Sequence, residues 1–354
     1  MKRILTTTVT LTLAMALLSG CAGKPATTQP SASTSVQPGA TAPSKEETET
    51  AVKTGLSMIT SVSKSEDASA EGNGTAQANI ALVAVTVGDD GVIDDCVIDA
   101  IQTSISFDAA GQLTTDPATT FASKNELGEA YGLKKASSIG KEWNEQAAAV
   151  ADYAVGKTVE ELKGIAVNEK GAPSDADLSA SITLSIADFV SGIEDAVSKA
   201  QHLGAKAGDR LTLNSTTDIS KSKSASAEGD GLAQAYATVA VVTFDGDTIT
   251  SCYIDAAEAH VNFSAEGVIT TDLSAAQPTK NEIGDGYGMK AASSIGKEWY
   301  EQAAAFGTYV TGKTAEDVAS IAESERTSPS DADLAASVTI GIGDFQTLIA
   351  KAAQ

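Results

Sequence analysis

Serine and threonine hydroxyls downstream of an aspartate are the residues of this chain best placed to do chemistry. Residues 173–183 read PSDADLSASIT, so Asp175 precedes Ser181 by six positions, with small residues between them. Small side chains leave the backbone accessible, so a bulky group could dock there and form a phosphoester with the hydroxyl. In the structural alternative, Asp175 caps a local turn that leads into a strand with Ser181 and Thr183 on one face. Residue types alone favour the structural alternative.

The same segment occurs a second time. Residues 329–339 read PSDADLAASVT, and the equivalent side chains lie 156 positions further on: Asp331, Ser337 and Thr339. A longer pair has the same offset, with ASSIGKEWNEQAAA at 136–149 and ASSIGKEWYEQAAA at 292–305. Two copies of this length indicate a duplicated domain rather than a solenoid of short repeats. We therefore expect whatever one copy does to be done twice.

The sequence contains no other recognisable catalytic or metal-binding motif. The two histidines, His202 and His260, are not at equivalent positions, and neither lies among cysteines or carboxylates at a metal-binding spacing. There is no nucleophile–histidine pair, no P-loop and no G-x-S-x-G motif. We therefore expect no metal site and no hydrolase or transferase chemistry. Cys96 and Cys252 are repeat equivalents in DDCVIDA and TSCYIDA, and we expect each to be a small buried residue on a strand.

Strand patterns come first in each copy. In the first copy, β-branched runs separated by Gly and Asp turns predict one strand over 80–87, a second through CVIDA and a third through SISF. The second copy repeats this order, starting with a strand over 238–244. Strands of this kind, joined by short turns, predict an antiparallel meander.

Helical periodicity follows the strands. Ile139, Trp143 and Ala147 begin one apolar stripe, and Thr158 is the expected N-cap of a short helix over 159–162. After PSDADL, the alternation over 182–186 predicts a strand before a closing helix. We therefore expect an α+β fold in two tandem copies, each an antiparallel sheet with helices covering one side.

Four aromatic side chains occupy equivalent positions in the two copies. Trp143 and Trp299 lie on the apolar helical stripe, which is typical of core residues. Tyr131 and Tyr287 lie in the Gly-rich turns EAYG and DGYG, where exposure is expected. The tyrosines are therefore the better candidates for stacking on a planar ligand.

The N-terminus has the pattern of a lipoprotein signal. Lys2 and Arg3 precede an apolar stretch too short to span a membrane, which ends in Leu-Ser-Gly-Cys at Cys21. This resembles the bacterial lipobox, in which the cysteine is acylated (for example with palmitate) and anchors the protein stably. The expected organisation is a signal peptide at 1–20, a lipidated flexible linker at 21–50, and domains at 51–203 and 204–354.

The overall charge limits the partners. The formal net charge is −23 and the pI is about 4.3. Such a surface repels phosphate backbones and anionic lipid, so we expect no nucleic acid partner. It suits a protein that must stay soluble at a cell surface.

The hydroxyl segment also resembles a known modification motif. In covalently flavinylated FMN-binding domains, an Asp precedes the acceptor hydroxyl by six residues, in roughly the pattern Asp-Gly-x-(Ser/Thr)-Gly-Ala-Thr. The resemblance assigns Asp175 and Asp331 to the aspartate and Ser181 and Ser337 to the acceptor. Among the departures from the pattern, the acceptor is Ser rather than the commoner Thr, Leu replaces the usual Ser/Thr (Leu178 and Leu334), and Ser179 and Ala335 replace the second Gly. Thr183 and Thr339 are the alternative acceptors. It implies two FMN groups, each attached through its phosphate by a separate flavin transferase.

The resemblance extends over the mature chain. The order of lipobox, low-complexity linker and two domains is similar to that of Gram-positive lipoproteins with tandem FMN-binding domains, which serve flavin-based extracellular electron transfer. This implies a lipid-anchored electron carrier on the extracellular face of the cell membrane, rather than an enzyme with its own substrate. Its partners would be a membrane quinol-linked donor and extracellular acceptors. The alternative is a cofactor-free binding or structural lipoprotein, and with either one the signal peptide could yield a pheromone.

Overall fold

The computed structural model describes residues 50–354 except 326. The predicted signal peptide, the acylated Cys21 and all of the linker except Thr50 lie outside the described residues. The described residues belong to one compact unit that contains both copies. Within the described part, no helix is both long enough and apolar enough to cross a membrane.

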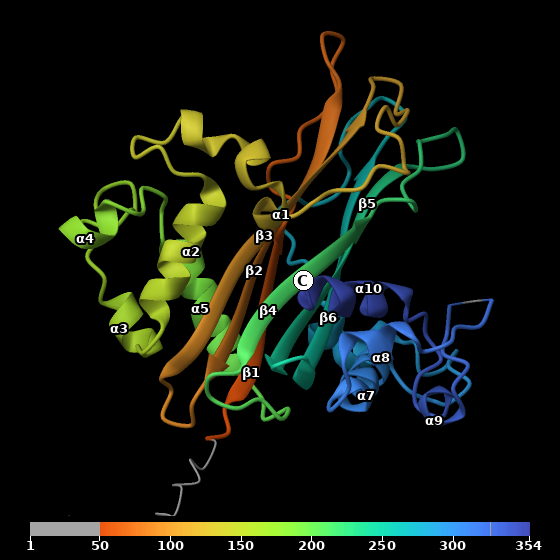
Figure 1. The fold of residues 1–354 in the computed structure, drawn as a ribbon. Coiled ribbons are helices and arrows are strands. Elements are labelled where there is room, and N and C mark those ends of the chain that lie inside the picture. Colours follow the sequence, from red (N-terminus) through yellow and green to blue (C-terminus); the bar gives the residue numbers. More distant parts are fainter. Residues whose placement is uncertain (1–49, 326) are drawn as a thin grey trace, which may run out of the picture. The chain divides into compact units, whose positions relative to one another are not determined.

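Each copy contributes a three-stranded antiparallel meander, as expected (Figure 1). The strands of the first copy are β1 (Lys53–Ser61), β2 (Gly74–Val87) and β3 (Ile93–Phe107). Those of the second copy are β4 (Arg210–Asp218), β5 (Gly231–Asp245) and β6 (Thr248–Phe263). Each strand pairs with the next one along the chain, which gives the orders β1-β2-β3 and β4-β5-β6.

Two strand predictions were wrong in detail. CVIDA and SISF belong to one long strand, because β3 pairs with β2 in unbroken register from Asp95 to Phe107. The first strand of each copy, β1 and β4, was not predicted, since SMITS and NSTTD are rich in hydroxyl residues and carry little apolar alternation. Their partners β2 and β5 supply the ladder that holds them extended.

Helices cover one face of each sheet. On the first sheet lie α2 (Trp143–Ala154) and α5 (Ala187–Lys199), and on the second lie α7 (Trp299–Val310) and α10 (Gly343–Ala352). The α2 helix begins at Trp143, so Ile139 precedes it; Glu142 and Glu145 form its capping box. The predicted short helix is α3 (Val159–Lys163), and Thr158 is its N-cap.

Short helices connect these elements. In the first copy they are α1 (Lys124–Leu127), the 3-10 turns η1 (Gly128–Tyr131) and η2 (Leu133–Lys135), and α4 (Ala176–Ser179). In the second copy they are α6 (Lys280–Ile283), η3 (Gly284–Tyr287), α8 (Ala315–Ala319) and α9 (Ala332–Ala335).

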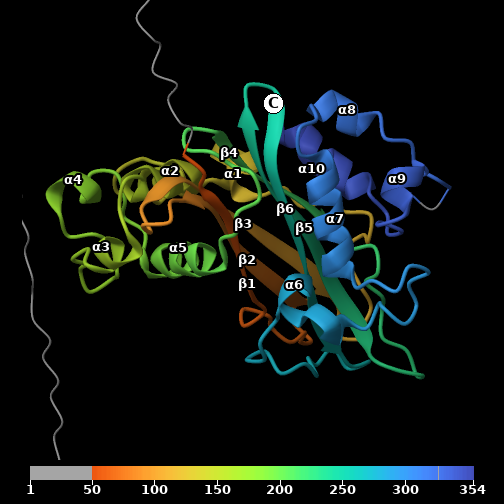
Figure 2. The same ribbon diagram turned by 90° about the horizontal axis from the view of Figure 1, so that it is seen from below.

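The other face of each sheet packs against the other copy. Buried Leu56, Leu82 and Ile101 form one apolar cluster with Leu213 and Val239 of the second copy. The order of layers is therefore helices, sheet, sheet, helices (Figure 2). The two sheets share a core, and each copy also has a core under its own helices.

The far ends of β3 and β6 meet in a second apolar cluster to which both copies contribute. Phe107 and Phe263 are repeat equivalents and both are fully buried. Their rings stack with centroids 4.1 Å apart and planes 5° apart. Gly74 and Gly231 lie beside them, and a Cβ at Gly74 would come within 2.5 Å of the Phe107 ring. These glycines are needed for close approach of the backbone to the stacked rings.

Candidate functional site

The SDADL segments form one helical turn, which agrees with the predicted turn capped by the aspartate. Asp175 is the N-cap of α4, and its Oδ1 accepts hydrogen bonds from the backbone N–H groups of Asp177 and Leu178. Asp331 caps α9 in the same way. The expected role of the aspartate as a local cap is therefore present in both copies.

The strand predicted over 182–186 is wrong, because a side chain takes the backbone group that a strand would need. The N–H of Thr183 donates to Oε1 of the fully buried Gln146 at 2.8 Å, and its hydroxyl donates to the same oxygen at 3.1 Å. The segment remains irregular until α5 begins at Ala187. Ser181 and Thr183 therefore do not share a strand face.

The glutamine links the two repeated motifs of each copy. The Gln146 side-chain amide donates to the carbonyl of Lys141 at 3.2 Å and to the hydroxyl of Ser137 at 3.4 Å, while its oxygen holds Thr183. Gln302 makes the equivalent contacts in the second copy with Lys297, Ser293 and Thr339. The sequence analysis missed this residue, although a glutamine on an otherwise apolar helical stripe was the available signal.

The expected acceptor serines have a different environment from the threonines. Ser181 is partly exposed, and its Oγ accepts a hydrogen bond from Lys141 Nζ at 3.2 Å. Ser337 is also partly exposed, and Lys297 occupies the position equivalent to Lys141. The serine hydroxyls are thus accessible, whereas each threonine hydroxyl is already donated to a buried glutamine.

A cavity of about 490 Å³ adjoins the first segment. Thr183, Ser179 and Ile182 line it together with Leu133 and Ser137 from the motif before α2. In the second copy, Asp331 and Ser330 line a cavity of about 670 Å³ with Tyr309, Lys313 and Asp317. Both volumes are within the range of small-molecule sites.

The tyrosine candidates do not line either cavity. Tyr131 lies under Lys124, whose Nζ is 4.7 Å from the ring centroid and equally far from the Trp143 ring. Tyr287 lies under Lys280 at 4.6 Å. One face of each tyrosine ring is therefore covered by a lysine ammonium.

The second copy has a buried ionic cluster around Lys280, which is only 6% exposed. Its Nζ lies 3.0 Å from Glu258 Oε1 and 3.2 Å from the Tyr236 hydroxyl, and the Tyr287 hydroxyl donates to the same carboxylate oxygen. Burial lowers the pKa of Lys280, but Tyr236, Tyr287 and Glu258 together raise it above its usual value. The first copy has Asn79 and Gln102 in place of Tyr236 and Glu258, so this cluster is particular to the second copy.

Cys96 and Cys252 are buried and free, each on a strand under the helices of its own copy. Burial raises the pKa of the Cys252 thiol to about 12 and that of Cys96 as well. A thiol held in its protonated form is a poor nucleophile. The described residues also contain no cluster of histidine, cysteine and carboxylate groups that could hold a metal.

The surroundings of Ser181 have the chemistry that a phosphoester of FMN at this hydroxyl would need. Ser181 presents an accessible hydroxyl, and Lys141 supplies a cation 3.2 Å from its oxygen that can offset phosphate charge. The adjoining cavity combines apolar Leu133 and Ile182 with polar Ser137. Such a mixture is typical of sites that bind an aromatic ring system with polar substituents.

Comparisons with known proteins give one local similarity. No protein-family model matches the chain, and no solved structure matches it. A stretch of 40 residues is 52% identical to part of a chlorophenol reductase from Desulfitobacterium hafniense. This stretch is 11% of the present chain and 12% of the reductase. A match of that extent shows neither a shared family nor a shared activity.

Proposed function

We propose that this protein is a lipid-anchored electron carrier with one FMN attached covalently to each copy. The flavins are joined through their phosphates to Ser181 and Ser337, and a separate flavin transferase carries out the attachment. FMN supplies reversible one- and two-electron transfer, while the protein holds and orients it. Electrons come from a membrane quinol-linked donor and pass to extracellular acceptors.

The observation that carries the proposal is the environment of the acceptor hydroxyl. In the first copy an accessible Ser181, six residues after a capping aspartate, lies against Lys141 and next to a cavity of about 490 Å³. The α4 turn presents this hydroxyl in a defined conformation, because the N–H groups of Ser181 and Ile182 both donate to the Leu178 carbonyl. A transferase therefore meets a shaped segment rather than a mobile loop.

A covalent attachment also suits a protein outside the cell. A reversibly bound cofactor would be lost by dilution into the medium, whereas a covalent bond keeps its local concentration independent of the medium. Anchoring through Cys21 retains the carrier at the membrane. A Cys21→Ala variant should therefore move from the membrane fraction to the medium.

Flavin attachment is tested by co-expression with a flavin transferase. A denaturing gel should show a fluorescent band, and intact mass should show two flavins per chain. Ser181→Ala and Ser337→Ala should each remove one flavin, and the double variant should remove both. Ser179→Ala is the matched control, since it alters a hydroxyl in the same segment and should leave labelling unchanged.

Two results would change the proposal. Full labelling of the double serine variant would move the acceptors to Thr183 and Thr339, to be checked with Thr183→Ala and Thr339→Ala. A wild-type protein without any flavin would favour a cofactor-free binding or structural lipoprotein.

Electron transfer is tested on the labelled protein. Dithionite should bleach the flavin absorbance, and a soluble ferric chelate should restore it.

A further inference from the structure

Three hydroxyl side chains follow Asp175 within the segment 173–183, namely Ser179, Ser181 and Thr183. Each of these residues is partly exposed, so accessibility alone does not select one of them. A phosphoester forms only when a hydroxyl gives up its proton and its oxygen attacks phosphorus. The hydrogen bonds of each hydroxyl therefore decide which of the three can react.

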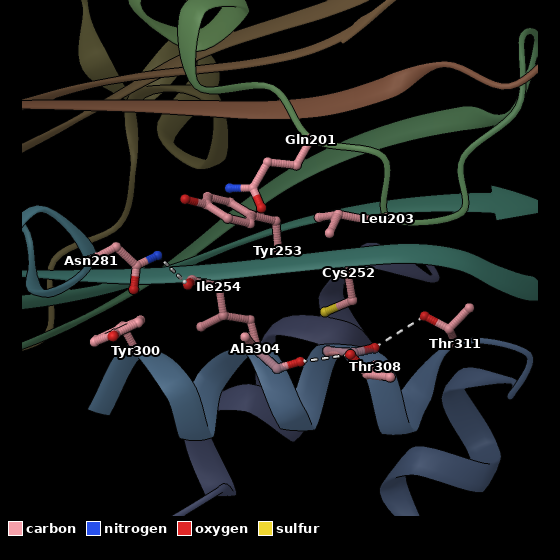
Figure 3. Close-up of a pocket in the computed structure, with 11 residues that line it drawn as sticks. Gln201, Leu203, Cys252, Tyr253, Ile254, Asn281, Tyr300, Ala304, Thr308 and Thr311 are labelled. Atoms are coloured by element: carbon pink, nitrogen blue, oxygen red, sulfur yellow. Dashed lines mark hydrogen bonds between the residues drawn. The ribbon is translucent and has the colours of Figure 1, made fainter. Parts of the chain in front are cut away.

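Two of the three hydroxyl protons are already donated within the chain. The Ser179 hydroxyl donates to a carbonyl of its own turn at 3.2 Å, and the Thr183 hydroxyl donates to Oε1 of buried Gln146 at 3.1 Å. Helical hydroxyls of the second copy are held in the same way, since Thr308 and Thr311 on α7 donate to carbonyls of that helix (Figure 3). Removing such a proton leaves its acceptor unsatisfied, which costs free energy.

The hydroxyl of Ser181 has the opposite arrangement. Its Oγ accepts a hydrogen bond from Lys141 Nζ at 3.2 Å, and no group among the described residues accepts its proton. The proton is therefore available to a base of the transferase. An ammonium group at this distance also stabilises the negative charge that develops on the serine oxygen and on the incoming phosphate.

One buried side chain sets both arrangements. The Gln146 Nε2 donates to the Lys141 carbonyl at 3.2 Å, and its Oε1 accepts a hydrogen bond from the Thr183 N–H at 2.8 Å. The glutamine thereby fixes the backbone of the lysine and the backbone beside Ser181 against each other. The same oxygen that places the segment also holds the threonine hydroxyl.

We infer that Lys141 and Gln146 determine which hydroxyl receives the flavin phosphate. Lys141 promotes attack by Ser181, and Gln146 withholds Thr183. This inference rests on the proposed function, because it concerns the same attachment.

The attachment is a phosphoryl transfer from an FMN phosphoanhydride that the transferase supplies. The Ser181 oxygen forms a bond to phosphorus while the bond from phosphorus to the leaving phosphate breaks. The serine proton passes to the base of the transferase, and the leaving phosphate departs with the electron pair of the broken bond. Lys141 remains protonated and donates its hydrogen bond throughout.

The second copy has the same contacts around its glutamine. Gln302 Nε2 donates to the Lys297 carbonyl at 3.1 Å, and Gln302 Oε1 accepts hydrogen bonds from the N–H and the hydroxyl of Thr339. An alanine replaces the first of the three hydroxyl residues, which leaves Ser337 and Thr339 after the aspartate. The same selection therefore favours Ser337 there.

The first test measures the rate of attachment at Ser181 in a full-length Ser337→Ala parent, with transferase and flavin donor added and intact mass followed over time. Lys141→Met should lower kcat at least about tenfold, as expected for loss of one charge-assisted hydrogen bond, and change KM little. Lys141→Arg should restore most of the rate, because it keeps a cationic donor. Lys135→Met removes an exposed lysine of η2 and should leave the rate unchanged.

The second test maps the attachment site by mass spectrometry of peptides. A Ser181→Ala, Ser337→Ala protein should carry no flavin. Adding Gln146→Leu releases the Thr183 hydroxyl, and flavin should then appear on Thr183. The equivalent threonine of the second copy should stay unmodified in this variant, since Gln302 still holds it. Circular dichroism and tryptophan fluorescence show whether the variant is folded.

The outcomes separate this inference from the proposed function. A parent protein without flavin contradicts the proposed function itself. A labelled parent whose rate is unchanged by Lys141→Met overturns the inference, and so does flavin on Thr183 while Gln146 is intact. A folded Gln146→Leu variant without flavin on Thr183 overturns it as well. If that variant does not fold, the effect of Lys141→Met on kcat decides.

Discussion

The positions of two buried aspartates on their strands determine their pKa values. Asp255 is 5% exposed, and its Oδ1 accepts hydrogen bonds from the backbone N–H groups of Ala256 and Asn281. Asp99 has the equivalent contacts in the first copy. Burial raises the pKa of Asp255 to about 6, against the opposing effect of these hydrogen bonds, and raises that of Asp99.

The raised pKa of Asp255 predicts a pH dependence of stability. Between its unfolded value of 3.8 and about 6, the folded state binds a proton that the unfolded state lacks. The contribution of this group to the free energy of unfolding therefore decreases as pH rises through that window. Asp255→Asn should remove this slope and stabilise the protein at pH 7 by up to about 3 kcal/mol, the equivalent of a shift of about two pKa units.

Urea unfolding of wild type and variant at several pH values between 4 and 8 measures this difference. Asp99→Asn is the equivalent variant of the first copy, and it should change the slope of unfolding free energy against pH in the same direction. The interpretation fails if the difference in unfolding free energy between wild type and Asp255→Asn is the same at every pH.

At the scale of elements, a buried glutamine decides the conformation of the candidate site. Gln146 on α2 holds Thr183 through both its N–H and its hydroxyl, at 2.8 and 3.1 Å. Gln146 Oε1 is the acceptor of the Thr183 N–H in the irregular segment before α5. The helix thus positions the loop that carries Ser181 and Thr183, the proposed acceptor and its alternative.

Gln146→Leu should release this segment while keeping most of the packing volume. We expect amide hydrogen exchange at Thr183 to become at least tenfold faster, with a stability loss of about 1–3 kcal/mol from the unsatisfied groups. Gln302→Leu should act in the same way on Thr339 and leave Thr183 unchanged, so each variant is the control for the other. Unchanged exchange at Thr183 in Gln146→Leu would show that the loop does not depend on the glutamine.

At the scale of the whole molecule, the two copies are joined by a shared core and by ion pairs at its edges. Lys199 Nζ lies 2.7 Å from Glu282 Oε1, and Lys351 Nζ lies 2.6 Å from Glu126 Oε1, so a closing helix of each copy contacts the other copy. These pairs are partly exposed and contribute little. The buried apolar contacts between the sheets are therefore the main stabilising interaction.

Loss of one stacked ring should destabilise both copies together. Phe107→Ala leaves a cavity beside Phe263, in the second apolar cluster that both copies form, and should cost about 3–5 kcal/mol. Trp143 reports on the first copy in a Trp299→Phe background, and Trp299 reports on the second copy in a Trp143→Phe background. Both fluorescence transitions in urea should shift by the same amount. A shift confined to the Trp143 transition would mean that the copies unfold independently.

The sequence by itself determined the duplication, the α+β class, the meander, the short helix capped by Thr158 and the burial of both cysteines. These features follow from local signals such as turn residues, period and capping side chains, which act over a few residues. The place of Thr183 could not be predicted in this way, because its strand-like alternation is overridden by Gln146, 37 residues away. Only tertiary structure brings that side chain to the segment.

Tertiary structure also decided how the two copies pack against each other. Sequence identity between the copies predicts two similar domains, but it does not show that their sheets pack face to face. That packing follows because the central strands β2 and β5 are apolar on both faces, and their own helices cover only one of these faces. Differences between the copies, such as Tyr253 and Tyr300 in place of Val97 and Asn144, matter for the same reason. Their effect depends on which elements meet around them, and the order of residues along the chain does not specify that.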